Sequence, residues 1–336
     1  MATNRITVGD INGIVGIVPT PATEDAARWD ADQTVDLDET AKMVEMVVAG
    51  GTDVLLTNGT FGECATLTGD ELYTFVDTVV QTVGGRIPVF AGATTLNTRD
   101  TVARGRKLAA LGVDGLFVGR PMWLPLDEQQ LVQYYRDVAE AVPEMALIVY
   151  DNPGAFKGKI SSRAYQELAS IPQVVAAKHI GLLLGGGAFI EDQKAVGNRI
   201  RLLPLENDWH YAAQLFPDEV TACWSGNVVC GAAPLMALKA AVGGRDWTDA
   251  AAIATQLEWA LEPLFPDGNF ELFMRYSIQI DNAEFAAAGL INPGPTRPPY
   301  QHAPERVLES GRECGRRWRA LHDRYSLATA DVALRA

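Results

Sequence analysis

The sequence predicts an α/β fold, a closed (β/α)8 TIM barrel with an added C-terminal helical subdomain. Short β-rich runs alternate with helical patterns along the chain, and most of these runs are apolar enough to be buried on both faces. The eight strand candidates are 14–20, 53–59, 88–93, 115–121, 147–153, 174–180, 200–207 and 220–227. A doubly wound open sheet is the alternative, but eight regular units without an obvious interruption favour closure.

The helical patterns between the strands begin at residues that can cap a helix. Asp38 starts the first, Thr68 precedes the second and Asn97 precedes the third. The clearest patterns are 37–49, 69–83, 98–111, 127–141 and 161–170, and 228–242, 249–264, 270–288 and 304–325 follow the eighth strand. We therefore expect a catalytic barrel at 1–243 and a helical extension at 244–336 that packs on it.

Composition excludes several classes of function. The chain has 336 residues, is 48% hydrophobic and carries a net charge of −14, which argues against nucleic-acid and anionic-membrane partners. No apolar run is long enough to span a membrane, and residues 1–10 do not resemble a secretory signal. Four scattered cysteines predict a reduced, cytoplasmic protein, and four dispersed histidines predict neither a metal nor another cofactor.

Lys178 is the most unusual residue of the chain. It is a lone amine near the end of the apolar run 174–180, where an unpaired ammonium would be costly. A lysine kept partly neutral by burial is a nucleophile that forms a Schiff base with a carbonyl compound. The alternative is a structural lysine that reaches the strand end and pairs with a carboxylate.

Other polar groups are expected at the same rim of the barrel, where the carboxyl ends of the strands build the active site. Tyr150 is near the end of strand five, the segment 57–63 follows strand two, and Trp224 and Asn227 end strand eight. Taken singly, Tyr150 would also suit a core and the glycines would also suit turns. Their convergence favours a catalytic Lys178.

The residue types fit chemistry on a 2-oxo acid. A Schiff base on Lys178 turns the carbonyl into an electron sink, and Tyr150 is suited to shuttle protons. Backbone N–H groups and the Thr60 hydroxyl, on a loop bracketed by Gly59 and Gly62, are suited to hold a carboxylate.

These motifs resemble the pyruvate-dependent class I aldolases, the superfamily of dihydrodipicolinate synthase and N-acetylneuraminate lyase. Gly59-Thr60-Phe61-Gly62-Glu63 is similar to the carboxylate loop of that superfamily, Tyr150-Asp151-Asn152-Pro153 to its tyrosine motif, and Lys178 to its Schiff-base lysine. A nearer resemblance, through 57–68, 121–123, 134–138 and 297–300, is to the hydratase-aldolases of polycyclic aromatic degradation. The resemblance covers nearly the whole chain and implies a homo-oligomer, commonly a tetramer.

The chain departs from dihydrodipicolinate synthase in ways that favour an aromatic substrate. Ala155-Phe156 stands where that synthase has an arginine for a polar semialdehyde. Phe61 replaces a loop threonine, and Met122-Trp123 replaces two tyrosines. Phe61, Trp123, Phe156 and Trp224 would border a pocket for an aromatic ring, although each alone would also suit a core.

The resemblance implies hydration and retro-aldol cleavage of a substituted trans-benzylidenepyruvate to an aromatic aldehyde and pyruvate. Arg120, which would pair with a ring carboxylate, and Ser277, which stands where hydroxyl-type relatives are expected to have asparagine, favour trans-2'-carboxybenzalpyruvate. The alternative is trans-o-hydroxybenzylidenepyruvate, which yields salicylaldehyde. Asn227 and Trp224 are expected to orient the water or the aldehyde oxygen.

Two further alternatives remain at this point. One is a pyruvate lyase or synthase of the same superfamily that uses another aldehyde, which the aromatic residues disfavour. The other is a non-catalytic barrel that senses a 2-oxo acid, which the presence of Lys178 and Tyr150 disfavours. The glycines at 185–187 are expected to form a hinge after strand six.

Overall fold

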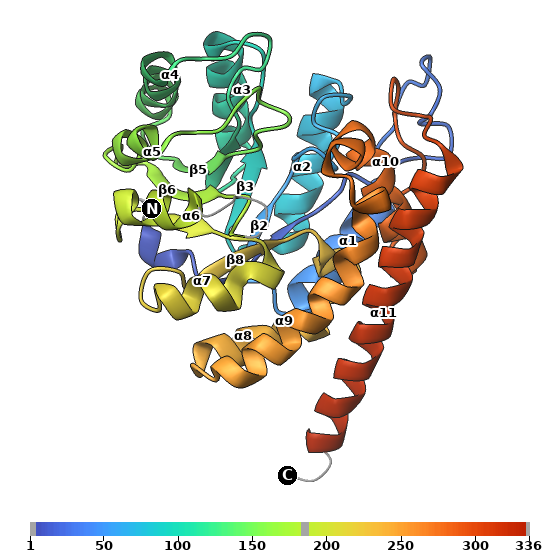
Figure 1. The fold of residues 1–336 in the computed structure, drawn as a ribbon. Coiled ribbons are helices and arrows are strands. Elements are labelled where there is room, and N and C mark those ends of the chain that lie inside the picture. The colour runs from blue at the N-terminus through green and yellow to red at the C-terminus, as the bar shows by residue number, and fades with distance from the viewer. Residues whose placement is uncertain (1–4, 183–187, 334–336) are drawn as a thin grey trace. The chain divides into compact units, whose positions relative to one another are not determined.

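Eight strands form one sheet in the computed structural model, which describes residues 5–182 and 188–333 (Figure 1). The sheet order is β7-β6-β5-β4-β3-β2-β1-β8. The strands are β1 (Gly13–Ile17), β2 (Val54–Leu56), β3 (Val89–Gly92), β4 (Gly115–Val118), β5 (Ala146–Tyr150), β6 (Val174–Lys178), β7 (Arg201–Leu203) and β8 (Ala222–Ser225). Each lies within or next to a predicted run, and the predicted hinge at 185–187 falls outside the described residues.

The two ends of this sheet approach each other. The pairs from β2 to β7 are parallel, and a parallel bridge joins Leu205, just after β7, to Trp224 of β8. Nearly every strand residue is buried, as expected of strands covered on both faces. The sheet is therefore a nearly closed (β/α)8 barrel, which confirms the predicted fold class.

The chain divides into two compact units. The first comprises 1–15, 53–57 and 85–224, and contains nearly all of the sheet. Its helices are α3 (Thr98–Ala110), α4 (Glu128–Ala141), α5 (Ser162–Leu168), α6 (Ala188–Val196) and α7 (Trp209–Leu215). Successive helices from α3 to α6 pack against one another, so the strand-helix alternation is regular here.

The second unit comprises 16–52, 58–84 and 225–336 and is mostly helical. Its helices are α1 (Leu37–Ala49), α2 (Gly69–Val83), α8 (Ala233–Gly243), α9 (Trp247–Leu261), α10 (Phe270–Ala288) and α11 (Glu305–Ala333). The longest, α11, packs along α10 and also contacts α8 and α9 (Figure 1). The predicted domain boundary at residue 243 stays a prediction.

The helix starts follow the capping rules with one correction. Thr68 accepts a hydrogen bond from the N–H of Glu71, and Asn97 accepts one from the N–H of Asp100, as predicted. The cap of α1 is Asp36, whose carboxylate accepts from the N–H of Glu39, rather than Asp38. Asp38 lies in the first turn, where the positive end of the helix dipole stabilises a negative charge.

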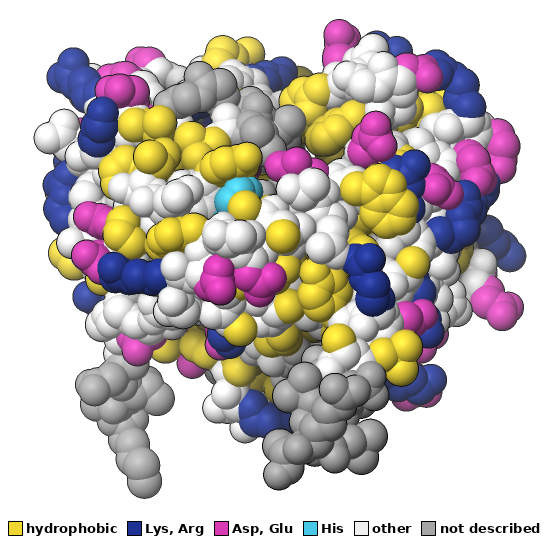
Figure 2. All heavy atoms as spheres, turned by 60° about the horizontal axis from the view of Figure 1, so that its bottom comes forward, with side chains coloured by type: hydrophobic (Ala, Val, Ile, Leu, Met, Phe, Trp, Pro, Cys, Tyr) yellow, Lys and Arg dark blue, Asp and Glu magenta, His cyan; other side chains and the backbone are white. Residues whose placement is uncertain are grey.

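The surface carries both signs of charge. On the face shown in Figure 2, basic and acidic side chains are interspersed rather than gathered by sign. Alternating ion pairs run along α11, where Arg312 and Arg316 pair with Glu309 and Glu313. Among the described residues, no helix has the length and apolar character needed to cross a membrane.

Candidate active site

Lys178 and Tyr150 lie side by side at the ends of adjacent strands. They are the last residues of β6 and β5, and they are partners in the parallel register. Residues in register point to the same face of a sheet, and both side chains are buried. The Lys178 Nζ atom lies 5.2 Å from the centroid of the Tyr150 ring. The structure thus brings together the two residues predicted to be catalytic.

Trp224 provides a surface for the lysine amine. The Lys178 Nζ atom lies 3.5 Å from the centroid of the Trp224 ring. The indole N–H of Trp224 donates to the carbonyl oxygen of His179 over 2.8 Å, which fixes the ring beside β6. An amine over an indole face is attracted by the ring quadrupole, so Trp224 helps the barrel accommodate a buried lysine.

Tyr150 is held by aromatic packing on two sides. Its ring stacks on Phe117 with centroids 4.4 Å apart and meets Phe156 edge to face at 5.1 Å. The side-chain N–H of Asn152 donates to the Tyr150 hydroxyl over 3.3 Å. These contacts hold the ring between two aromatic side chains, and the catalytic role of its hydroxyl stays a prediction.

The predicted aromatic wall is brought together only in part. Phe156 is 3% exposed and packs on Gly119, where an added Cβ atom would fall 2.2 Å from the Phe156 ring. Only glycine permits that close approach. Trp123, by contrast, is 75% exposed, so its side chain is not buried with Phe156 and Tyr150. A place for Trp123 in the pocket stays a prediction.

Arg120 lies just after β4 and is buried. Its guanidinium pairs with the Asp151 carboxylate at 3.1 Å and donates to the carbonyl oxygens of Phe156, at 3.3 Å, and Gly158. Asp151 also accepts a hydrogen bond from the Tyr165 hydroxyl. Burial, and then the charge of Asp151, raises the pKa of Tyr165 well above its ordinary value, so this group remains a donor. The pairing of Arg120 with a ring carboxylate stays a prediction.

A second buried pair lies directly after Lys178. The His179 ring contacts the Asp192 carboxylate at 3.0 Å and accepts the N–H of Gly181. Asp192 also accepts from the Ser162 hydroxyl and pairs with Lys159 at 3.2 Å. Burial alone would raise the pKa of Asp192, but the hydrogen bonds from His179 and Ser162 and the nearby positive charge lower it below its ordinary value.

The predicted carboxylate loop belongs to the second unit. It folds tightly on itself, because the N–H of Glu63 donates to the carbonyl oxygen of Thr60 and that of Cys64 to Gly59. Gly62 is favoured here, since a Cβ atom would lie 3.0 Å from the backbone of Asn58 and Gly59, a tight contact. Such a loop presents backbone groups at close range, as carboxylate binding requires.

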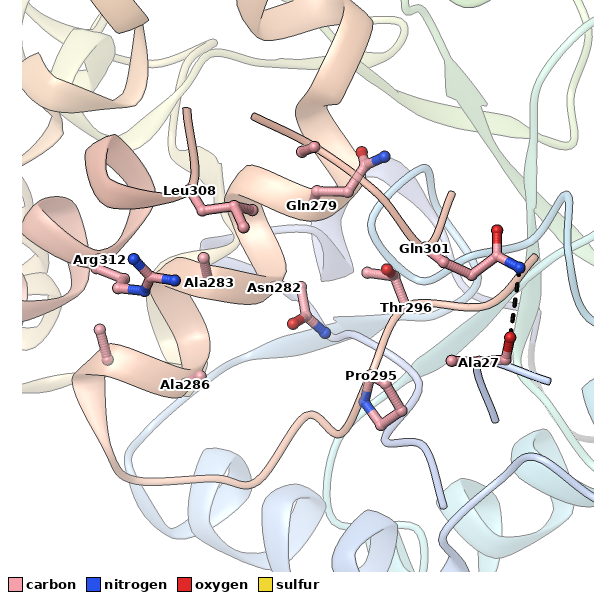
Figure 3. A pocket seen from close by; sticks show the side chains of 12 residues that line it. Ala27, Gln279, Asn282, Ala283, Ala286, Pro295, Thr296, Gln301, Leu308 and Arg312 are labelled. Atoms are coloured by element: carbon pink, nitrogen blue, oxygen red, sulfur yellow. Dashed lines mark hydrogen bonds between the residues drawn. The ribbon is translucent and has the colours of Figure 1, made fainter. Parts of the chain in front are cut away.

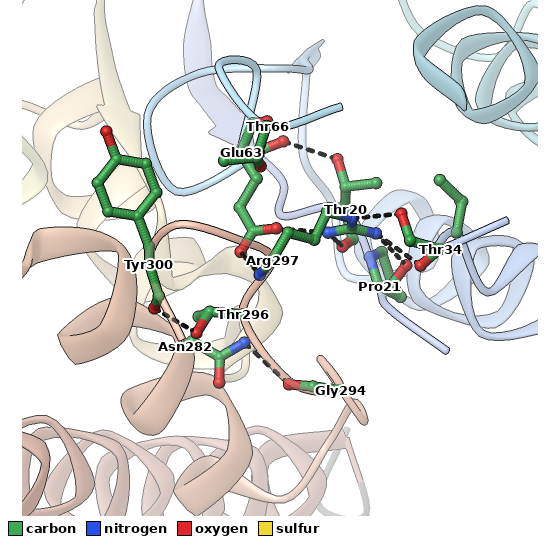
Figure 4. A network of polar contacts seen from close by, with 12 residues as sticks. Thr20, Pro21, Thr34, Glu63, Thr66, Asn282, Gly294, Thr296, Arg297 and Tyr300 are labelled. Carbon is green, nitrogen blue, oxygen red and sulfur yellow. Dashed lines mark hydrogen bonds and ion pairs between the residues drawn. The ribbon is translucent and has the colours of Figure 1, made fainter. Parts of the chain in front are cut away.

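Arg297 anchors this loop (Figure 4). It pairs with Glu63 at 2.6 Å, and its remaining donors reach the Thr34 hydroxyl and the carbonyl oxygens of Thr20, Pro21 and Thr34. Glu63 also accepts the backbone N–H of Arg297, and both side chains are buried. Arg297, in the segment between α10 and α11, thus ties that segment to the loop.

Three further predicted residues lie in the second unit. Phe61 meets Phe285 of α10 edge to face at 5.4 Å and packs on Gly226. Asn227 is buried, and its side-chain nitrogen has no hydrogen-bond partner among the described residues. Ser277 is buried directly after Tyr276, whose backbone angles break the regular course of α10.

A cavity of about 500 Å³ lies between α10, α11 and the segment 295–303 (Figure 3). Gln279, Asn282 and Gln301 line it, but their side-chain N–H groups donate to the carbonyl oxygens of His302, Gly294 and Ala27. Alanines form most of the remaining lining. The residues predicted to form the active site do not line this cavity.

Sequence reasoning missed the contacts of several buried charged or polar residues near the predicted catalytic residues and in the predicted loop. Asp151, Glu63 and Arg297 appear in motifs of the resemblance, and His179 lies in the strand-six run, but none was given a supporting contact. For Asp151 and His179 the signal is a charged or polar residue directly beside Tyr150 or Lys178 in an otherwise apolar segment. The partner is not visible because it is remote, up to 234 residues away for Glu63 and Arg297.

Comparison with known proteins identifies the family. Residues 16–184 match the profile of the dihydrodipicolinate synthetase family. A full-length relative in Nocardioides sp. (strain KP7), named trans-2'-carboxybenzalpyruvate hydratase-aldolase, is 57% identical over 98% of this chain and 100% of its own. The chain belongs to the dihydrodipicolinate synthetase family.

Other members of this family support the assignment. A trans-O-hydroxybenzylidenepyruvate hydratase-aldolase of Pseudomonas aeruginosa is 44% identical over 97% of both chains. The solved structure of PhdJ bound to a substrate intermediate has a TM-score of 0.95 and 62% identity, covering 96% of this chain and all of that one. Dihydrodipicolinate synthase of Acinetobacter baumannii shares the fold at 23% identity, with a TM-score of 0.75 over 92% of this chain and 99% of that one. The predicted membership is confirmed, and the chain is a lyase of the hydratase-aldolase type.

Proposed function

We propose that this protein hydrates and cleaves trans-2'-carboxybenzalpyruvate to 2-carboxybenzaldehyde and pyruvate, a step of phenanthrene catabolism. The observation that carries the proposal is the register of Lys178 and Tyr150, which puts an amine and a phenol at adjacent strand ends. The name of the relative that is 57% identical supplies the substrate. No cofactor or metal takes part in the proposed reaction.

The reaction begins at Lys178. Its neutral amine attacks the 2-oxo carbon, and loss of water from the carbinolamine leaves an iminium ion. Tyr150 donates and accepts the protons of these steps, which suits a hydroxyl beside the amine. Gly59 and Thr60 hold the carboxylate of the pyruvyl group through backbone N–H groups and the Thr60 hydroxyl.

Hydration and cleavage follow from the same iminium ion. It draws electrons through the conjugated double bond, so water adds to the benzylic carbon while the carbon next to the iminium takes a proton. Tyr150 then removes the proton of the new hydroxyl, and the bond between the two former alkene carbons breaks. The aldehyde leaves, and the remaining enamine is protonated and hydrolysed to pyruvate and free Lys178.

The aromatic ring is recognised by apolar and polar side chains. Phe61, Trp123, Phe156 and Trp224 are proposed to border it. The unpaired side-chain nitrogen of Asn227 supports a hydrogen bond to the water or aldehyde oxygen. Ser277 is proposed to favour a carboxylated ring, whereas the guanidinium of Arg120 is already engaged by Asp151.

The alternative substrate is trans-o-hydroxybenzylidenepyruvate, which yields salicylaldehyde in naphthalene catabolism. It is favoured by the names of relatives at 44% identity. Purified protein should be assayed with both compounds under the same conditions. We expect a higher kcat/KM for the carboxylated compound, and the reverse order would assign the protein to the other branch.

The experiment that tests the mechanism is trapping with borohydride in the presence of pyruvate. We expect a stable adduct on Lys178, located by peptide mass spectrometry, and no adduct in Lys178→Arg. Lys194→Arg, on the surface of α6, is the matched control and should trap normally. An unmodified Lys178 after reduction would overturn the Schiff-base mechanism.

We also propose a cytoplasmic homotetramer. The assembly rests on the resemblance to tetrameric aldolases, and the location on four cysteines that are not joined in disulfides in the described chain. Light scattering on a sizing column gives the number of subunits, and cell fractionation gives the compartment.

A further inference from the structure

The loop that follows β5 is held at three points by one side chain. Arg120 pairs with Asp151 at the start of this loop and donates to the carbonyl oxygens of Phe156 and Gly158 towards its end. The Arg120 Cζ atom also lies 5.6 Å from the centroid of the Phe156 ring. Arg120 is 3% exposed, so these bonds form away from solvent.

We propose that Arg120 is a positioning residue for Tyr150 and acts by fixing the loop 151–158. A planar guanidinium can donate in several fixed directions at once, which a lysine ammonium on a flexible stem cannot reproduce. The inference rests on the proposed function for its choice of substrates. It gives Arg120 a task that does not involve the ring of the substrate.

The loop is coupled to Tyr150 through Asp151. Asp151 directly follows Tyr150, and its backbone N–H donates to the carbonyl oxygen of Lys178 over 3.2 Å. Its carboxylate receives Arg120 on one oxygen and the Tyr165 hydroxyl on the other. Asp151 is therefore held by contacts from the end of β4, from β6 and from α5. Because Asp151 is bonded to Tyr150, its position fixes the backbone of Tyr150 at the end of β5.

The loop is coupled to Tyr150 a second time through Phe156. The Phe156 ring lies against Gly119 on one side and meets Tyr150 edge to face on the other. The Phe156 backbone is held by Arg120 and by its own N–H, which donates to the carbonyl oxygen of Asn152. If the loop loosens, the wall that orients the Tyr150 ring moves with it.

If Arg120 only positions Tyr150, replacing Arg120 should lower kcat by the same factor for every substrate that needs Tyr150. A ring carboxylate would have to compete with Asp151 and two carbonyl oxygens for the guanidinium. A residue that bound this carboxylate would matter only for the carboxylated compound. The ratio of the losses on the two benzylidenepyruvates therefore separates positioning from direct recognition.

The test variant is Arg120→Lys, which keeps a cation beside Asp151 and so protects the fold, but loses the bonds to Phe156 and Gly158. We expect kcat to fall about 10- to 100-fold on both substrates by the same factor, with KM changed less than about threefold. Amide hydrogen exchange within 152–158 should become at least about 10-fold faster, since the N–H groups of Phe156 and Gly158 are bonded inside the loop.

Two further variants keep the test decisive. Arg120→Met also loses the pairing with Asp151, so both the exchange within 152–158 and the loss of kcat should exceed those of Arg120→Lys. Arg136→Lys is the matched control, because that arginine makes an exposed ion pair with Glu167, and it should leave kcat and exchange unchanged. A loss confined to the carboxylated substrate, or normal kcat and loop exchange in Arg120→Lys, would overturn the proposal. If the unmodified protein turns over neither compound, the proposed function fails, while the exchange measurement still decides whether Arg120 fixes the loop.

Discussion

The indole of Trp224 contacts the amine of Lys178 and the backbone beside it. The Lys178 Nζ atom lies 3.5 Å from the ring centroid, and the indole N–H donates to the carbonyl oxygen of His179, the next residue along. A cation over a tryptophan face gains about 0.5–2 kcal/mol, depending on its exposure to water. Trp224 therefore supplies part of the stabilisation that a lysine at the end of an apolar strand requires.

Replacement of Trp224 should slow the reaction of Lys178 with pyruvate, because the indole fixes where the amine lies and a misplaced amine attacks the carbonyl more slowly. Trp224→Phe keeps a ring face but loses the N–H donor, and we expect trapping with borohydride to slow about threefold. Trp224→Leu loses both contacts and should slow it about 10-fold. Intact-mass spectrometry during reduction measures the rate. Trp259→Leu, which removes a half-exposed tryptophan that lies beneath Arg317, should trap at the normal rate. Equal rates in all three variants would contradict the assignment.

Tyr150→Phe should separate catalysis from packing. The ring contacts with Phe117 and Phe156 are retained, so the unfolding midpoint in urea should change little. Loss of the hydroxyl removes the proposed proton carrier, and kcat should fall about 100-fold or more. Stopped-flow assays of aldehyde formation measure this loss. Activity within a fewfold of the unmodified protein would assign proton transfer to another group.

The parts of the fold that local pattern controls could be read from the sequence. Apolar runs that end in glycine, proline or polar residues located all eight strands, and Thr68 and Asn97 located two helix starts. Because barrel strands are parallel, their carboxyl ends meet at one rim, which is why Lys178 and Tyr150 could be expected together.

The contacts between residues far apart in the chain could not be read from the sequence. Arg120 and Asp151 are 31 residues apart, and Arg297 and Glu63 are 234 apart. No periodicity links such positions, because an ion pair depends on which loops meet after folding. The exposure of a side chain is equally hidden from the sequence: Trp123 is 75% exposed, and its place in the pocket stays a prediction.

Arg297→Met should destabilise the protein strongly. It leaves the Glu63 carboxylate buried without its cation, which typically costs about 3–5 kcal/mol. The free energy of unfolding from urea titration is the measurement. Arg316→Met removes an arginine that makes exposed pairs on α11, and it should change that energy by less than about 1 kcal/mol. Similar losses in the two variants would mean that the buried pair does not anchor the chain.

Asp192 should make the free energy of unfolding depend on pH in the acid range. The pKa of its carboxyl is lowered in the folded chain, since the hydrogen bonds from His179 and Ser162 outweigh the effect of burial. As the pH falls, the unfolded chain therefore binds a proton at this carboxylate before the folded chain does. The stability that the anion contributes is full above about pH 4, and it is lost as the pH falls from there through the folded pKa. Asp192→Asn should reduce the slope of unfolding free energy against pH in this acid range by up to about 1.4 kcal/mol per pH unit, the effect of one proton. Ser162→Ala removes one of the bonds that lower the pKa and should give an intermediate slope.

Urea titrations at several values between about pH 6 and about pH 3 provide the comparison. Because slopes rather than absolute stabilities are compared, a general loss of stability in either variant does not obscure the result. An unchanged slope in Asp192→Asn would show that another carboxylate governs the acid response.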